Sequence, residues 1–236
     1  MDRVLFCDLF FTLIVPYYQS EKECDVLNLT PLEWENYAEK SDLYMERALG
    51  KVKTEREIIG RIGKLLPFPV TKEQEDLLLK RRLERMRLAM SNVDQEVLQT
   101  LGNIRNQGIK ICLISNADVI DCKYWKDSSL YKMFDLSVFS CNVKMLKPDI
   151  KIYQYAMEQM STTPEKSIFV GDGGSDELRG AKLAGMKTVF SEHLEEKQEA
   201  DRIRILKYAD YHIKKFSGLI DCLEAEWGDF EEEWEL

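Results

Sequence analysis

Short apolar runs alternate with longer amphipathic stretches in most of the chain, and this pattern predicts strands that alternate with helices. Residues 3–7 form a short run rich in Val, Leu and Phe, which is typical of a buried strand. Similar runs recur after residue 93, at 109–114, 134–139, 167–170 and 187–190. Helices are predicted around them at 94–107, 121–132, 149–160 and 175–184. The alternation indicates an α/β fold with a mostly parallel sheet that is covered on both faces.

The stretch from 17 to 91 has a different pattern, because it is dense in Glu, Lys, Arg and Leu and poor in β-branched residues. Thr30 followed by Pro31 is a typical helix start, and Thr71 precedes a second helix over 72–89. We therefore predict a helical domain that is inserted into the α/β domain. The predicted division is an α/β core over 1–16 and 92–223, a helical insert over 17–91 and an acidic tail over 224–236.

Composition and charge limit the classes of protein that the chain can belong to. The 236 residues are 44% hydrophobic and 32% charged, which is a globular balance and excludes a disordered or collagen-like chain. No apolar run approaches the roughly 20 residues of a membrane-spanning helix, and the first residues lack the pattern of a secretion signal. The formal net charge of −9 argues against a nucleic-acid partner.

The six cysteines form no CxxC pair, which argues against a zinc knuckle or a thioredoxin-like site. Cys7 and Cys112 lie inside strand-like runs and are interpreted as small core residues. This usage favours a reducing compartment, and we expect a cytoplasmic protein. The acidic balance still permits an anionic small-molecule substrate, because one local cation or metal ion reverses the electrostatic field at the site. We expect neither a nucleic-acid nor a membrane partner.

Polar side chains follow several of the predicted strands, where a parallel sheet binds its ligands. Asp8 follows the first strand, Ser115 and Asn116 end the strand at 109–114, and Lys147 comes before the next helix. The glycine-rich stretch 171–176 adds two carboxylates four residues apart, a spacing that suits a hard cation. A charge in the apolar surroundings of Asp8 costs several kcal/mol unless it is paired or metal-bound, so Asp8 is predicted to be functional. Taken alone, the serine–asparagine pair also fits a turn, and the lysine also fits a solvated surface.

These residues together resemble the motifs of the haloacid dehalogenase (HAD) superfamily. The resemblance covers about 1–15 and 93–192, and it implies a Rossmann-like parallel-sheet core with an inserted helical cap of the C1 type. The four motifs are similar to the segments 8–13, 113–116, 147–149 and 170–176. The helical insert directly follows the first motif, where a C1 cap lies in such proteins.

The resemblance implies a role for each motif residue in a hydrolase. Asp8 is implied as the nucleophile that forms a covalent aspartyl intermediate. Ser115 and the backbone N–H of Asn116 would bind the transferred group, and Thr12 is assigned to the same phosphate-binding set. Lys147 would hold Asp8 and offset the negative charge of the transition state.

The resemblance also implies a bound Mg²⁺ ion. Its ligands would be the carboxylates of Asp8 and Asp172, the backbone carbonyl of Phe10, and Asp176 directly or through water. The electrostatics support a divalent cation, since three carboxylates and a phosphate around one lysine repel one another strongly.

Phe10 departs from the pattern of the family's phosphatases, which place a second Asp at this position to protonate the leaving group and activate water. General acid–base catalysis contributes about 10²–10⁴-fold. The first hypothesis is nevertheless a Mg²⁺-dependent phosphatase that acts on a small phosphorylated metabolite. One alternative is a 2-haloacid dehalogenase, because halide leaves without a proton, with Arg47, Arg56 or Arg61 as the halide-binding cap residue. Another alternative is a non-catalytic binding protein with the same fold.

Overall fold

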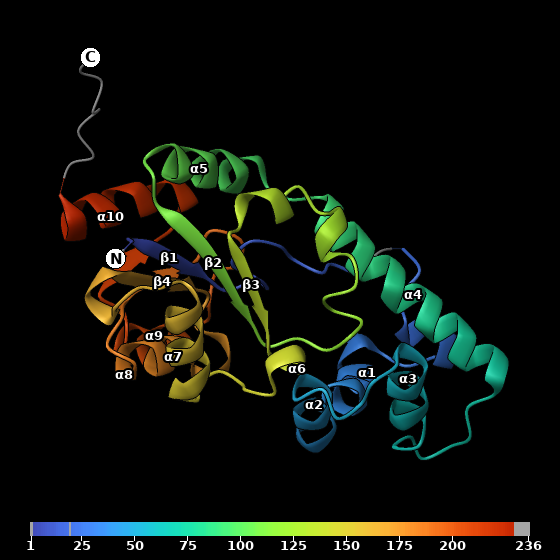
Figure 1. Ribbon diagram of the computed structural model, residues 1–236. Coiled ribbons are helices and arrows are strands. Elements are labelled where there is room, and N and C mark those ends of the chain that lie inside the picture. Colours follow the sequence, from blue (N-terminus) through green and yellow to red (C-terminus); the bar gives the residue numbers. More distant parts are fainter. Residues whose placement is uncertain (1, 19, 229–236) are drawn as a thin grey trace.

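A six-stranded sheet forms the centre of the computed structural model, which describes residues 2–18 and 20–228 (Figure 1). The strand order is β3-β2-β1-β4-β5-β6, and every neighbouring pair is parallel. The strands are β1 (Val4–Cys7), β2 (Lys110–Ser115), β3 (Leu136–Phe139), β4 (Ser167–Gly171), β5 (Lys187–Ser191) and β6 (Tyr211–Ile213). The α/β fold with a parallel sheet that the sequence predicts is therefore confirmed.

Each face of the sheet is buried under its own group of helices (Figure 1). Alternate residues of β1 point to opposite sides, so that Leu5 and Cys7 belong to one apolar cluster while Val4 and Phe6 belong to another. The first cluster includes residues from α5 (Gln95–Asn106) and α10 (Leu219–Trp227). The second includes residues from α7 (Ile150–Gln159), α8 (Glu177–Leu183) and α9 (Glu199–Leu206).

The segment between β1 and α5 is largely helical, as the sequence predicts, and it contains four α-helices. They are α1 (Pro31–Ala38), α2 (Ser41–Ala48), α3 (Glu55–Gly63) and α4 (Lys72–Ser91). Thr30 and Thr71 both cap their helices through reciprocal hydrogen bonds with the third helical residue. A third apolar cluster, which includes Trp34, Ile58 and Leu78, holds these helices together. Figure 1 shows α1, α2 and α3 beyond the end of the sheet and the long α4 beside them. The division of the chain into a core and a cap domain stays a prediction.

The predicted helix over 121–132 is wrong. This segment is a series of turns with two short 3₁₀ helices, Trp125–Asp127 and Tyr131–Met133, and α6 (Ser140–Val143) follows β3. The Asp118 carboxylate accepts hydrogen bonds from the backbone N–H groups of Ile120 and Asp121, at 2.7 and 3.1 Å. Such local side-chain bonds replace the backbone bonds of a helix, and they explain the loop.

The C-terminal part of the described chain also differs from the prediction. The strand β6 and the helix α9 were not predicted, since β6 has only three residues and lies at the edge of the sheet. The helix α10 continues to Trp227, past the predicted tail boundary at 224. The tail residues Phe230 and Trp234 lie outside the described residues. Within residues 2–18 and 20–228, no helix is long and apolar enough to cross a membrane.

Candidate active site

Asp8 lies directly after β1, at the carboxyl edge of the sheet. Cys7 pairs in register with Leu113 of β2 and with Val170 of β4, so the ends of three neighbouring strands meet around Asp8. The side chain is buried, with an exposed fraction of 5% for the residue. Its Oδ1 contacts the ammonium of Lys147, and its Oδ2 accepts a hydrogen bond of 3.2 Å from the Thr12 hydroxyl. The structure thus places Thr12 on the carboxylate of Asp8.

Lys147 is equally buried and reaches two carboxylates. Its Nζ contacts Asp8 and lies 2.5 Å from Glu177 Oε2. Burial opposes the charged form, but the two carboxylates outweigh it and raise the pKa of Lys147 above the ordinary value of a lysine. The side chain of Asn116 holds the backbone of Lys147, because Oδ1 accepts from its N–H at 2.8 Å and Nδ2 donates to its carbonyl at 2.9 Å. Asn116 is therefore a positioning residue for this lysine.

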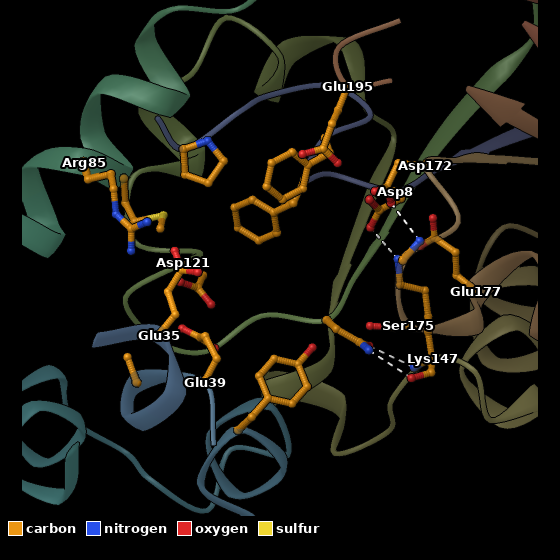
Figure 2. A pocket seen from close by; sticks show the side chains of 18 of the residues that line it. Asp8, Glu35, Glu39, Arg85, Asp121, Lys147, Asp172, Ser175, Glu177 and Glu195 are labelled. Carbon is orange, nitrogen blue, oxygen red and sulfur yellow. Dashed lines mark hydrogen bonds and ion pairs between the residues drawn. The ribbon is translucent and has the colours of Figure 1, made fainter. Parts of the chain in front are cut away.

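Three buried carboxylates lie together here, and two of them, Asp8 and Glu177, contact this lysine (Figure 2). Oxygens of Asp8, Asp172 and Glu177 all lie within 4.8 Å of one another. Burial raises the pKa of Asp8 above its ordinary value, Lys147 opposes that shift, and the nearby Asp172 adds to it. Burial and the Asp8 charge raise the pKa of Glu177 as well. A cluster of hard oxygen donors with more negative than positive charge fits a divalent cation such as Mg²⁺.

Asp176 lies outside this cluster, and its role as a metal ligand, directly or through water, stays a prediction. Its side chain is 45% exposed, and its Oδ1 accepts from Arg204 at 2.5 Å. The residue has a left-handed backbone, with φ of 52°, just before α8 begins. The next residue, Glu177, turns to the site instead and is 1% exposed. Gly171 makes room for it, since a Cβ there would lie 2.1 Å from Glu177 Oε1.

Ser115 ends β2 and is fully buried. Its hydroxyl oxygen has no hydrogen-bond partner among the described residues. A buried hydroxyl without a partner costs free energy, so a ligand oxygen at this place would satisfy it. This arrangement fits the predicted phosphate-binding role.

Two further residues of the site could not be predicted from the sequence. Lys197 follows β5 and places its Nζ 2.6 Å from Asp172 Oδ2 and 5.4 Å from the centre of the Phe11 ring. The buried Glu192 holds this loop, because its Oε1 accepts from the backbone N–H of Lys197 at 2.7 Å. Arg202 and His212 bind the same carboxylate. In the sequence Lys197 lies in a polar, glutamate-rich stretch, and no motif or spacing marks it.

Replacing Glu192 with Gln is expected to destabilise the protein and to change its acid sensitivity. Burial opposes ionisation, but the bonds from Arg202, Lys197 and His212 lower the pKa of Glu192 from 4.5 to about 2. A lowered pKa stabilises the fold above the unfolded-state value, and this stabilisation is lost as pH falls from about 4.5 to about 2. This pKa shift corresponds to about 3 kcal/mol of folding free energy at pH 7. Urea unfolding of both proteins at pH 7 and pH 3 measures the effect, and Glu192→Gln should lose more stability at pH 7 than at pH 3. An equal loss at both pH values would contradict the lowered pKa of Glu192.

A cavity of about 450 Å³ opens between the carboxyl edge of the sheet and the helical segment. Asp8, Lys147 and Asp172 line one end. Phe10 and Phe11 line it as well, so the position without a proton-transfer group faces this cavity. The other end is formed by side chains from α1, α2, α4 and the loop after β2. The cavity has the size of a site for a small metabolite.

A protein-family model matches the larger part of the chain. The model of a haloacid dehalogenase-like hydrolase matches residues 18–185. Glyceraldehyde 3-phosphate phosphatase from Methanothermobacter thermautotrophicus is 32% identical over 111 residues, which are 46% of this chain and 47% of that enzyme. The enzyme of the same name from Pyrococcus furiosus is 31% identical over 137 residues, 57% of this chain and 55% of that enzyme. Bifunctional epoxide hydrolase 2 from Rattus norvegicus is 27% identical over 108 residues, 44% of this chain and 19% of that protein. The chain thus spans about half or less of the length of these curated relatives.

Solved structures share the fold over nearly the whole chain. The L-2-haloacid dehalogenase from Xanthobacter autotrophicus superposes with a TM-score of 0.65 at 15% identity, covering 95% of this chain and 99% of that chain. A HAD family enzyme from Bacteroides thetaiotaomicron, in complex with magnesium and inorganic phosphate, gives 0.62 at 20% identity, covering 85% and 98%. At these identities the similarity shows the fold alone.

Proposed function

The chain belongs to the haloacid dehalogenase-like hydrolase family, and we propose that it is a Mg²⁺-dependent phosphatase that acts on a small phosphorylated metabolite. One observation carries the proposal: carboxylate oxygens of Asp8, Asp172 and Glu177 lie within 4.8 Å of one another where these residues line the cavity. Carboxylates this close together repel an anionic substrate unless a cation offsets their negative charge. The phosphatases among the relatives support the same reaction class.

In this mechanism the Asp8 carboxylate attacks the phosphorus atom and the ester oxygen leaves, which gives an aspartyl phosphate. Lys147 holds Asp8 in position and stabilises the charge on the phosphoryl oxygens. Ser115 donates its unpartnered hydroxyl to one of these oxygens. Water then cleaves the aspartyl phosphate and releases inorganic phosphate.

Asp8, Asp172 and the backbone carbonyl of Phe10 would hold the Mg²⁺ ion, whose positive charge offsets that of the phosphate and the carboxylates. Glu177 keeps Lys147 paired while Asp8 reacts. The helical segment 17–91 acts as the cap, because α1 and α4 supply side chains to the far end of the cavity. Closure of such a cap excludes water from the covalent intermediate.

Phe10 favours a second candidate, the hydrolysis of a carbon–halogen bond, because a halide ion leaves without a proton. The acid cluster opposes it, since Asp172 and Glu177 would repel the carboxylate of a 2-haloacid. We therefore place phosphatase chemistry first.

Hydrolysis of p-nitrophenyl phosphate with Mg²⁺ and with EDTA tests the proposal. Nitrophenolate is a good leaving group that needs little acid assistance, so we expect turnover despite Phe10 and its loss in EDTA. Restored turnover after excess Mg²⁺ is the control for chelator damage. Turnover that is equal in EDTA, or release of chloride from 2-chloropropionate without any phosphatase activity, would contradict the proposal.

A further inference from the structure

The end of the cavity opposite Asp8 contains charged groups of both signs. Figure 2 shows the carboxylates of Glu35, Glu39 and Asp121 and the guanidinium of Arg85 on this side. Arg82 from α4 lines the same end. This end therefore offers both hydrogen-bond acceptors and hydrogen-bond donors to the part of a substrate that is remote from the phosphate.

Arg82 is the most buried of these groups and is incompletely bonded. The residue is 2% exposed, and its Nη2 lies 3.5 Å from both Asp118 Oδ2 and Asp121 Oδ1. Its Nη1 lies 3.6 Å from Glu39 Oε1, and neither this nitrogen nor Nε has a hydrogen-bond partner among the described residues. Buried N–H groups without acceptors are costly, so a ligand oxygen beside them would be bound favourably.

Glu35 and Arg85 supply further hydrogen-bonding groups for a ligand. Glu35 Oε1 accepts a hydrogen bond of 3.1 Å from the Tyr18 hydroxyl, and within the described chain no ion pair includes this exposed carboxylate. Arg85 uses Nε toward Glu23 at 2.8 Å and stacks over the Tyr18 ring, with 4.5 Å from its central carbon to the ring centre. Its terminal nitrogens remain as donors toward the cavity (Figure 2).

The charge balance selects the kind of group that fits here. Among the charged groups that line this end, two are guanidiniums and three are carboxylates: Arg82, Arg85, Glu35, Glu39 and Asp121. A second phosphate or a carboxylate on the substrate would add to this negative excess. An ammonium group would suit the carboxylates, but it has no lone pair to accept from the guanidinium. A hydroxyl group both donates and accepts hydrogen bonds, so it fits the carboxylates as well as the guanidiniums.

We propose that the substrate is the phosphate monoester of a sugar or a polyol, whose hydroxyl groups are bound by Glu35, Arg82 and Arg85. This inference rests on the proposed phosphatase function and names its substrate class. Trp34, which also lines this end, gives an apolar wall against which a carbon chain or ring can pack.

A panel of phosphate esters tests the inference, with each kcat/KM divided by that for p-nitrophenyl phosphate. We expect glucose 6-phosphate or sorbitol 6-phosphate to exceed O-phosphoethanolamine, O-phosphoserine and 3-phosphoglycerate by about 10-fold or more, the effect of one or two hydrogen bonds. An amino or carboxylate ester that equals or exceeds both polyol esters would overturn the proposal.

Variants connect the preference to these side chains. Glu35→Ala is expected to lower the ratio for the preferred polyol ester about 10-fold, and because Glu35 is exposed the fold should persist. Arg82→Lys, which keeps the charge but removes the fork of N–H groups, should lower it similarly. Asp42→Ala, at an exposed carboxylate of α2 outside the cavity, is the matched control and should leave the ratio unchanged. An unchanged ratio in Glu35→Ala would contradict its assignment to a hydroxyl.

A binding measurement separates failure of the substrate class from failure of the proposed reaction. An enzyme that does not turn over p-nitrophenyl phosphate would contradict the proposed reaction but would leave the substrate class untested. Thermal unfolding of Asp8→Asn with Mg²⁺ then measures ligand binding without turnover. We expect sorbitol 6-phosphate to raise the midpoint more than inorganic phosphate or O-phosphoethanolamine does at equal concentration. Equal shifts would reject the polyol assignment whether or not the enzyme turns over.

Discussion

Replacing Asp8 with Asn is expected to lower kcat for p-nitrophenyl phosphate by at least about 10³-fold while the protein remains folded. The amide has nearly the same shape as the carboxylate but is a poor nucleophile. Among the described residues, Asp8 is the carboxylate that contacts both Thr12 and Lys147, so no other group replaces it. Lys147 keeps Glu177 as its partner at 2.5 Å, so the substitution leaves no unpaired buried charge. Steady-state kinetics together with circular dichroism and thermal unfolding measure both parts of the expectation.

Asp176→Asn provides the matched comparison, because it makes the same chemical change outside the acid cluster. The exposed Asp176 bonds Arg204, so we expect kcat to change less than about threefold, within the small effects of surface ion pairs. A large loss in Asp176→Asn would mean that this carboxylate turns to the site during turnover, and it would contradict the assignment of Glu177 in its place. Retained activity in Asp8→Asn would reject the covalent mechanism itself.

The sequence predicts those residues of the site whose positions are determined by the ends of the parallel strands. Parallel strands end at one edge, so the residues at or just after the ends of β1, β2 and β4 must lie near one another whatever the conformation of the loops. Asp8, Ser115 and Asp172 are predictable on this basis. The strand pattern predicts Lys147 at the same edge, but its contact with Asp8 follows only from the resemblance to a family motif, since its position depends on the hydrogen bonds of Asn116 to its backbone.

What could not be predicted depends on side-chain direction and on contacts between distant segments. Asp176 and Glu177 are neighbours in the sequence, and the left-handed backbone at Asp176 decides which of them reaches the site. Lys197 reaches Asp172 through a loop held by Glu192, a contact with no signal in the spacing. The arrangement of Arg82 against Glu39 depends on how the helical segment packs, which periodicity alone leaves open.

Phe10→Asp is expected to raise kcat/KM for an alkyl phosphate ester by about 10²-fold, the lower end of what general acid–base catalysis contributes. Phe10 lines the cavity beside Asp8, so a carboxylic acid at this position faces the leaving oxygen. It can protonate the departing alkoxide and then accept a proton from the attacking water. The gain should be much smaller for p-nitrophenyl phosphate, whose leaving group needs little help, and the ratio of the two gains is the quantity to measure.

Phe10→Asn is the control that separates proton transfer from the loss of an aromatic ring. Phe10 is partly buried against two apolar clusters, so both substitutions remove similar packing and should cost similar stability. Asn has the shape of Asp but cannot give up a proton at neutral pH, so the control should show no selective gain for the alkyl ester. An equal gain in both variants would mean that the ring merely blocks the leaving group. No gain in a folded Phe10→Asp protein that still requires Mg²⁺ would mean that the cavity holds the leaving oxygen away from this position, and that the chain catalyses its reaction with another arrangement of acid and substrate.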